Sequence, residues 1–320
     1  MSAGGGKKAI FAALGANLGI AVIKYVAFVF SGSASMLAES LHSVADSGNQ
    51  ALLLLGGRRS RRQASAEHPF GYGRDRYFYA FVVSVVLFTL GGLFALYEGY
   101  EKIRHPHELA DWYWPVGVLL VAIVMESFSL RTAVVESNHV RGSQSWVEFV
   151  RRAKAPELPV VLLEDLAALI GLALALVGVS LAVLTGNPVW DGVGSMCIGA
   201  LLVVIAVILA AETKSMLIGE AATRSDISKI EAALRAEPGV RRIIHMRTMH
   251  LGPDELLVAA KFAIRRWDSA ADVAHTINAA EELIREAVPI ARVIYLEPDF
   301  QDMEQPDVPV ETAGPVTLGD

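Results

Sequence analysis

Long apolar segments limit what this chain can fold into more than any other feature of its sequence. Six of them have about twenty residues, the length that an α-helix needs to cross the hydrocarbon core of a bilayer. They cover residues 9–30, 36–56, 78–100, 115–135, 158–184 and 189–211. Only 19% of the 320 residues are charged, whereas soluble domains carry about 25%. We therefore predict an all-α membrane domain over residues 1–212, a bundle of six transmembrane helices.

Basic residues gather at one end of these segments. They precede the first segment, or lie between the second and third or the fourth and fifth: Lys7, Lys8, Arg58, Arg59, Arg61, Arg62, Arg74, Arg76, Arg141, Arg151, Arg152 and Lys154. Loops rich in Lys and Arg stay in the cytoplasm, so we expect both termini to be cytoplasmic. The start of the chain shows no Ala-x-Ala cleavage site, so we treat the first segment as a retained helix. The simplest location is the cytoplasmic membrane of a bacterium.

Charged residues become common beyond residue 212, which predicts a water-soluble domain over residues 213–300. A helical segment capped by Ser225 ends at Pro238-Gly239, and two strand-like runs, RRIIHMRTMHL and ELLVAAKFAI, follow it. A second helix begins at Ser269, and ARVIYLEP reads as a third strand. The predicted order α-β-β-α-β makes a small α+β domain. Residues 301–320 are rich in Pro, Asp and Gly, and we expect them to be disordered.

Four polar residues interrupt the second apolar segment. Glu39, His42, Asp46 and Asn49 follow one another at steps of three, four and three, so they share one helix face. His42 and Asp46 have the spacing of two ligands on a helix that bind one divalent cation. An ionisable residue in the middle of a membrane helix costs about 2.5–3.5 kcal/mol of insertion free energy. A chain that keeps several such residues is therefore expected to use them for its function. The alternative is a buried polar contact between helices.

The fifth segment contains Glu164 and Asp165 inside an otherwise apolar span. Adjacent residues lie about 100° apart around a helix and cannot both face one point equally well. We expect Asp165 to be a metal ligand and Glu164 to be a second ligand, a proton carrier or an outer partner. A set of histidine and carboxylate ligands suits Zn2+, and carboxylate-rich variants accept Mn2+ or Fe2+.

Three more polar residues are expected to assist this site. Lys24 in the first segment lies at a depth similar to that of Glu39, and pairing would neutralise both charges. The alternative is that Lys24 extends to the outer surface. Asn17 lies two turns further inward on the same face as Lys24. Asp191 at the start of the sixth segment is a candidate for steering cations outward, or else a helix cap.

The segment SGSASMLAESLHSVADSGNQALLLLG, followed by a basic loop with HPFGYGR, resembles the cation diffusion facilitator family of metal/proton antiporters. The resemblance covers nearly the whole chain, including the order of the six helices and a C-terminal domain of ferredoxin-like, metallochaperone-like type. It implies a homodimer in the lipid bilayer that exports Zn2+, or a similar ion such as Co2+ or Cd2+, in exchange for protons. It also implies that His42, Asp46 and Asp165 bind the transported ion.

The sequence departs from the family pattern at several positions. Val161 stands where the family usually has a His or Asp ligand, and Glu164 is the candidate replacement. The segments LLEDLAA and GNPVWDGVGS resemble a distinct branch that includes an animal mitochondrial zinc exporter. The basic loop keeps His68 but has Tyr72 in place of a second histidine. His275 and Glu297 resemble members of the family's C-terminal metal cluster, so His68, His275 and Glu297 are the candidates for cytoplasmic metal sites.

The expected mechanism is alternating access to a site near the bilayer midplane. Ligands must lose protons to bind metal, so binding releases protons, and His42 is the residue most able to exchange one near neutral pH. A net charge of -6 argues against a nucleic-acid partner. The sequence lacks the His-Glu-x-x-His and Gly-x-Ser-x-Gly motifs of hydrolases, so we expect no enzyme. The alternatives of another class are a membrane metal sensor without transport and a passive channel.

Overall fold

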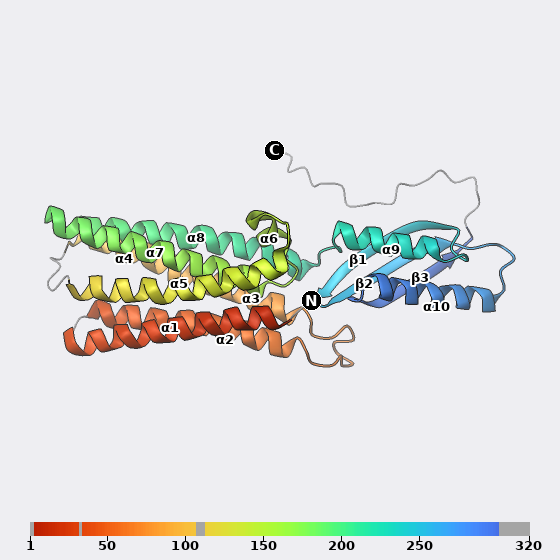
Figure 1. The fold of residues 1–320 in the computed structure, drawn as a ribbon, viewed down its shortest axis with the longest axis horizontal. Coiled ribbons are helices and arrows are strands. Elements are labelled where there is room, and N and C mark those ends of the chain that lie inside the picture. Colours follow the sequence, from red (N-terminus) through yellow and green to blue (C-terminus); the bar gives the residue numbers. More distant parts are fainter. Residues whose placement is uncertain (1–2, 32–33, 107–112, 301–320) are drawn as a thin grey trace. The chain divides into compact units, whose positions relative to one another are not determined.

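A computed structural model of the chain describes residues 3–31, 34–106 and 113–300 (Figure 1). The chain divides into two compact units, Met1–Leu217 and Ile218–Asp320. The predicted disordered tail, residues 301–320, lies outside the described residues, as do the side chains of Glu39 and His42.

Long helices make up the first unit. Their bounds are α1 Ala3–Ser31, α2 Ala34–Arg59, α3 Asp75–Val86, η1 Leu87–Leu93, α4 Phe94–Arg104, α5 Tyr113–Arg141, α6 Trp146–Arg152, α7 Glu157–Thr185 and α8 Val189–Ile218. Among the described residues, five stretches are long and apolar enough to cross a membrane: Gly6–Val26, Asp75–Arg104, Pro115–Arg141, Glu157–Thr185 and Val189–Ile218. These correspond to five of the predicted spans. The remaining predicted span, residues 36–56, lies in α2, which is not among the five.

The stretch Asp75–Arg104 is helical throughout but not α-helical throughout. Its middle, η1, is a π-helix, and the backbone keeps helical dihedral angles where η1 meets α3 and α4. The sequence predicted one regular helix here. It also did not predict the short helix α6, which begins where the Ser145 hydroxyl accepts a hydrogen bond from the backbone N–H of Glu148 at 3.2 Å.

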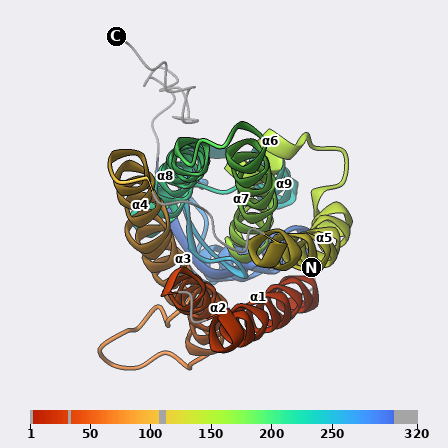
Figure 2. The same ribbon diagram turned by 90° about the vertical axis from the view of Figure 1, so that its left-hand side faces the viewer.

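The helices α1, α2, α5 and α7 pack together, with α1 in contact with each of the other three (Figure 2). Small residues such as Ala9, Ala13 and Ala133 lie in the core of this unit. They let helices approach closely, as membrane helices require. At the cytoplasmic end predicted from the basic loops, Arg76 of α3 forms a mostly buried ion pair with Glu157 of α7. This pair holds the start of α7 against α3. Glu157 lies seven residues before Glu164 in the sequence.

Glycines bring α8 into backbone contact with the helix formed by η1 and α4. A Cβ atom added to Gly99 would lie 2.7 Å from the backbone nitrogen of Met196. One added to Gly199 would lie 2.7 Å from the backbone nitrogen of Leu96. Gly92 and Gly192 face the same contact, so each helix presents two glycines two turns apart. Any side chain at these positions would separate the two helices.

The second unit is a three-stranded mixed sheet with two helices. The elements are α9 Arg224–Ala236, β1 Arg242–Gly252, β2 Glu255–Ala263, α10 Ala270–Ala287 and β3 Ala291–Asp299, which confirms the predicted order α-β-β-α-β. Strands β1 and β2 form an antiparallel hairpin, while β2 and β3 are parallel and are joined through α10. Both helices contact each other and the sheet, and Ile230, Leu256 and Ile284 are fully buried in the core between them.

The two predicted helix starts in this unit had different outcomes. Ser269 caps α10, and Asp272 completes a reciprocal capping box with it. The prediction that Ser225 caps the first helix was wrong, because Thr223 is the cap and α9 starts at Arg224. Thr223 lies three residues before Asp226 and accepts a hydrogen bond from its backbone N–H, the spacing that a capping side chain needs.

Candidate functional site

Buried acidic residues of the first unit gather where α1, α2, α5 and α7 meet. Glu164 and Asp165 of α7 and Glu126 of α5 are almost completely buried, and Asp46 of α2 is half-buried. Glu126 interacts electrostatically with each of the other three and with Lys24 of α1. We call Asp46, Glu126, Glu164 and Asp165 the acidic cluster. The structure thus brings together the predicted carboxylates of two helices and adds one from a third.

Two amide side chains of α2 hold Glu164. Asn49 Nδ2 and Gln50 Nε2 each donate a hydrogen bond of 3.0 Å, one to each carboxylate oxygen. Gln50 Oε1 in turn accepts a hydrogen bond of 3.5 Å from Asn17 Nδ2 of α1. Asn17 and Asn49 were expected near the site, whereas Gln50 was not. A polar amide directly after Asn49, ahead of the apolar run ALLLLG, was the signal that could have identified it.

Asp165 contacts α5 instead. Ser129 Oγ donates a hydrogen bond of 2.7 Å to Asp165 Oδ2. Adjacent residues therefore face different helices, as the 100° step around a helix requires. Val161, one turn before Asp165, is fully buried in the apolar core and supplies no ligand.

Asn49 also offers an acceptor to this region. Its Oδ1 atom is buried and has no hydrogen-bond partner among the described residues. A side-chain carbonyl oxygen can ligate a hard cation or accept a hydrogen bond from a hydrated one. No three His, Cys, Asp or Glu side chains in the described part of the chain are placed to hold a metal ion together. The described carboxylates therefore form a loose acidic cluster rather than a closed coordination shell.

Lys24 is buried rather than extended to the outer surface, so that alternative was wrong. Only 7% of the residue is exposed, and its Nζ atom donates a hydrogen bond of 3.3 Å to Ser43 Oγ of α2. Its electrostatic interaction with Glu126 helps to explain why a cation is stable there. Its predicted pair with Glu39 stays a prediction, because the side chain of Glu39 lies outside the described residues.

Asp191 joins two helices. Its Oδ2 atom lies 3.0 Å from Lys102 Nζ of α4, and the same ammonium lies 3.1 Å from Glu98. Lys102 also donates a hydrogen bond of 3.3 Å to Ser195 Oγ of α8. Asp191 thus neutralises a lysine at the end of the α4–α8 contact, and its role in steering cations stays a prediction.

The three candidates for cytoplasmic metal sites come from different elements, His68 from the first unit and His275 and Glu297 from the second. His68, in the loop before α3, packs its ring edge-on against Tyr72 with 4.7 Å between ring centroids. His275 lies on α10 and Glu297 on β3. Glu297 forms an ion pair of 3.1 Å with Lys261. Hydrogen bonds to Asp299 and Glu297 raise the pKa of Lys261 above its ordinary value.

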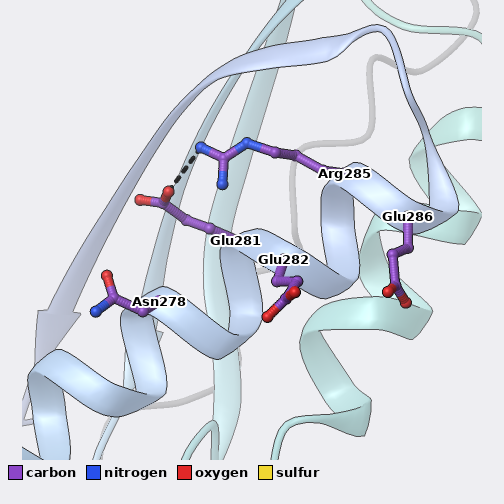
Figure 3. A pocket seen from close by; sticks show the side chains of 5 residues that line it. All are labelled: Asn278, Glu281, Glu282, Arg285 and Glu286. Carbon is purple, nitrogen blue, oxygen red and sulfur yellow. Dashed lines mark hydrogen bonds and ion pairs between the residues drawn. The ribbon is translucent and has the colours of Figure 1, made fainter.

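A shallow hollow runs along α10 (Figure 3). Its lining residues are Asn278, Glu281, Glu282, Arg285 and Glu286, and Arg285 lies 2.7 Å from Glu281. None of these residues was predicted to act in transport, and i,i+4 pairs of this kind are ordinary on an exposed helix. The hollow is therefore no candidate for the transport site.

Comparisons with known proteins identify relatives of this chain. Residues 10–218 match the cation efflux transmembrane domain. The mitochondrial proton-coupled zinc antiporter SLC30A9 of Xenopus laevis is 33% identical over 241 residues, which cover 74% of this chain and 43% of that protein. Metal tolerance protein C4 of Arabidopsis thaliana is 30% identical over 249 residues, covering 77% of this chain and 54% of that protein.

A bacterial relative is more distant but matches over more of its own length. The cation-efflux pump FieF of Serratia proteamaculans is 26% identical over 256 residues, covering 78% of this chain and 79% of that protein. The chain spans less than half of the length of the frog antiporter that it matches. The family domain nevertheless covers most of the chain and includes every member of the acidic cluster. The chain therefore belongs to the cation efflux family of membrane transporters, the cation diffusion facilitators.

Proposed function

We propose that this protein is a divalent metal cation efflux transporter that exchanges cytoplasmic Zn2+ for protons. The observation that carries the proposal is the acidic cluster, in which Glu126, Glu164 and Asp165 are buried on helices long and apolar enough to cross a membrane. Buried carboxylates at this depth are rare unless they serve a transported ion or proton. The name of the frog relative, a proton-coupled zinc antiporter, supports both the metal and the counter-ion.

In this proposal the ion is bound by His42 and Asp46 of α2 and by Asp165 of α7, with Glu164 beside them. The ligands bind metal only when His42 is neutral and the carboxylates are ionised, so binding on the cytoplasmic side releases protons. Protonation from the other side then favours release of the metal. Movement of helices exposes the site to each side in turn.

The finer architecture belongs to the same proposal. We take α2 as a sixth span, both termini as cytoplasmic, and the second unit as a ferredoxin-like domain that joins two copies into a homodimer. The proposed location is the cytoplasmic membrane of a bacterium, and the basic loops favour cytoplasmic termini there. The word mitochondrial in the names of the animal relatives refers to those proteins. The proposal includes no enzymatic activity.

A second candidate differs only in its cargo. The acidic cluster has four carboxylates, and oxygen-rich sites suit Mn2+ better than sites built from nitrogen and sulfur do. An exporter of Mn2+ or Fe2+ is therefore the alternative within the family. The alternative of another class is a membrane metal sensor, which would bind metal and move none.

Ion uptake into proteoliposomes distinguishes these functions. The purified protein is reconstituted with a metal-sensitive dye inside, and Zn2+, Mn2+, Fe2+, Co2+ and Cd2+ are offered in turn, with and without an acidic interior. We expect Zn2+ uptake that an acidic interior accelerates and that Asp46→Ala abolishes. Val44→Ala, an exposed position on the same helix, is the control that should keep full uptake.

Other outcomes would replace the proposal. Faster uptake of Mn2+ or Fe2+ than of Zn2+ would favour the second candidate. Metal flux that does not depend on the pH gradient would indicate a channel. Metal binding without flux would indicate a sensor. Normal flux in Asp46→Ala would move the transport site away from α2.

A further inference from the structure

Arginines gather at one end of the sheet in the second unit. Arg241 and Arg242 stand at the start of β1, and the backbone N–H of Arg241 donates a hydrogen bond of 2.9 Å to the carbonyl of Ala263, where β2 ends. Arg265 and Arg266 follow β2 directly. Three of the four arginines are exposed, and Arg242 is half-buried. We call these four residues the arginine patch.

Two nearby carboxylates already have other partners. Asp268 Oδ2 accepts a hydrogen bond of 3.0 Å from the backbone N–H of Arg265. Asp299 Oδ2 lies 2.9 Å from Lys261 Nζ. The side chains of Arg241 and Arg265 form no hydrogen bond or ion pair with any residue that the structure describes. Their positive charges are therefore available to an anionic partner.

Two large apolar side chains lie at the same end of the sheet. Trp267 follows Arg266 and is 80% exposed, and Phe300 follows β3 and is 54% exposed. The backbone N–H of Ile264 donates a hydrogen bond of 3.1 Å to the carbonyl of Asp299, so β3 ends beside the segment that carries Trp267. An indole ring offers a large, rigid contact surface that costs little conformational entropy to bind.

The chain continues from this end of the sheet into an acidic segment, residues 301–320, which lies outside the described residues. The segment contains no Lys or Arg, and its acidic residues are Asp302, Glu304, Asp307, Glu311 and Asp320. An extended chain spans about 3.3–3.6 Å per residue, and neighbouring strands lie about 4.8 Å apart. The first acidic residues, which come two and four positions after Phe300, are therefore within reach of the whole arginine patch.

We propose that residues 301–320 bind the arginine patch of their own chain and pack beside Trp267. The charges of the two partners are opposite and attract each other over about 8 Å at physiological salt. Attachment of the segment to β3 gives it a high effective concentration at the patch, which favours the same chain over a second copy. Every residue of the contact belongs to the second unit, so the inference goes beyond the transport proposal and does not depend on it.

Fluorescence of bimane, a dye that tryptophan quenches on contact, tests this interaction in the whole chain in detergent. Cys197→Ser removes the exposed native cysteine, and Gln305→Cys then carries the dye without changing the charge of the acidic segment. Trp267 is the only tryptophan of the second unit. We expect the dye to be quenched at low salt and to become bright in Trp267→Phe, which keeps an apolar ring.

The arginine patch should be necessary for this quenching. We expect Arg241→Gln combined with Arg265→Gln to make the dye as bright as Trp267→Phe does. Salt at about 1 M, where charges are screened beyond about 3 Å, should have the same effect. Arg292→Gln is the matched control, because Arg292 is an exposed arginine of β3 at the opposite end of the sheet. This variant should keep the quenching.

Charge reversal separates the contact from local unfolding. Arg241→Glu with Arg265→Glu should release the segment, and the further changes Asp302→Lys and Glu304→Lys should restore the quenching. Equal brightness of the dye with Trp267 and with Trp267→Phe would overturn the proposal, as would quenching that survives loss of the arginines. Quenching of a labelled Trp267→Phe chain by a co-expressed, unlabelled chain would also overturn it, by assigning the contact to a second copy. No outcome depends on metal flux, so a failure here is distinct from a failure of the transport proposal.

Discussion

At the scale of single residues, the proposed site depends on side chains that orient the carboxylates. Ser129 holds one oxygen of Asp165, and Asn49 with Gln50 holds both oxygens of Glu164. These contacts fix the carboxylates on α7 against two different helices. Groups of this kind set the orientation and the basicity of a ligand although they do not touch the metal themselves.

Loss of the Ser129 hydroxyl should therefore weaken metal binding. We expect Ser129→Ala to raise the dissociation constant for Zn2+ about tenfold, the lower end of the effects seen when such supporting contacts are removed. Calorimetry on the purified protein measures it. Ser127→Ala is the control, because Ser127 is exposed and its hydroxyl donates to the carbonyl of Ile123 on the same helix. Equal dissociation constants for Zn2+ in the two variants would mean that Ser129 does not orient Asp165.

At the scale of elements, the contact between α4 and α8 depends on the absence of side chains. Backbone atoms of each helix lie only 2.7 Å from where a Cβ of the other would be, at Gly99 and at Gly199. The ion pair between Lys102 and Asp191 adds a polar connection between the same two helices. We conclude that these helices form one closely packed pair.

A single methyl group in this contact should be costly. We expect Gly199→Ala to lower the stability of the protein by about 1–3 kcal/mol, because the backbone of Leu96 must move. Thermal unfolding in detergent should show a lower midpoint. Gly117→Ala on α5 is the control, since an added Cβ there meets no atom within 4 Å. A midpoint for Gly199→Ala that matches this control would contradict the close contact.

Elements were predictable from the sequence where their signals are local. Five long apolar helices, the order of the C-terminal strands and the cap at Ser269 all follow from length, turns and spacing within a few residues. The π-helix η1 carries no such signal, and the start of α6 carries only the spacing of Ser145 and Glu148, which was not used. The acidic cluster was predictable only in part: Glu126 joins it, and Gln50 contacts it through Glu164, by packing between helices far apart in the sequence. One polar residue in an apolar segment does not reveal which helix it faces.

At the scale of the whole molecule, the chain consists of two units that each have a core of their own. The first core is formed by helices with small residues, and the second lies between a mixed sheet and two helices. All members of the acidic cluster belong to the first unit. Metal binding in the membrane should therefore be separable from the function of the second unit.

Removal of the second unit tests this separation. We expect a chain that lacks residues 220–320 to bind Zn2+ with nearly wild-type affinity, because the acidic cluster and its supporting contacts stay complete. We expect the same chain to dimerise more weakly. Sedimentation in detergent measures dimerisation, and calorimetry measures binding. Lost Zn2+ affinity in a folded, truncated chain would contradict this division of roles.

The π-helix η1 has a consequence for how the length of this protein can vary. A π-helical turn inside an α-helix corresponds to one additional residue, and an additional residue rotates everything beyond it by about 100°. Deletion of one residue within Leu87–Leu93 would let the turn become α-helical, and Arg76 and Gly99 would keep their relative orientation. The same deletion within α8 would turn half of its glycines away from α4. The stretch Asp75–Arg104 is thus the place where related chains can differ by one residue without repacking the membrane unit.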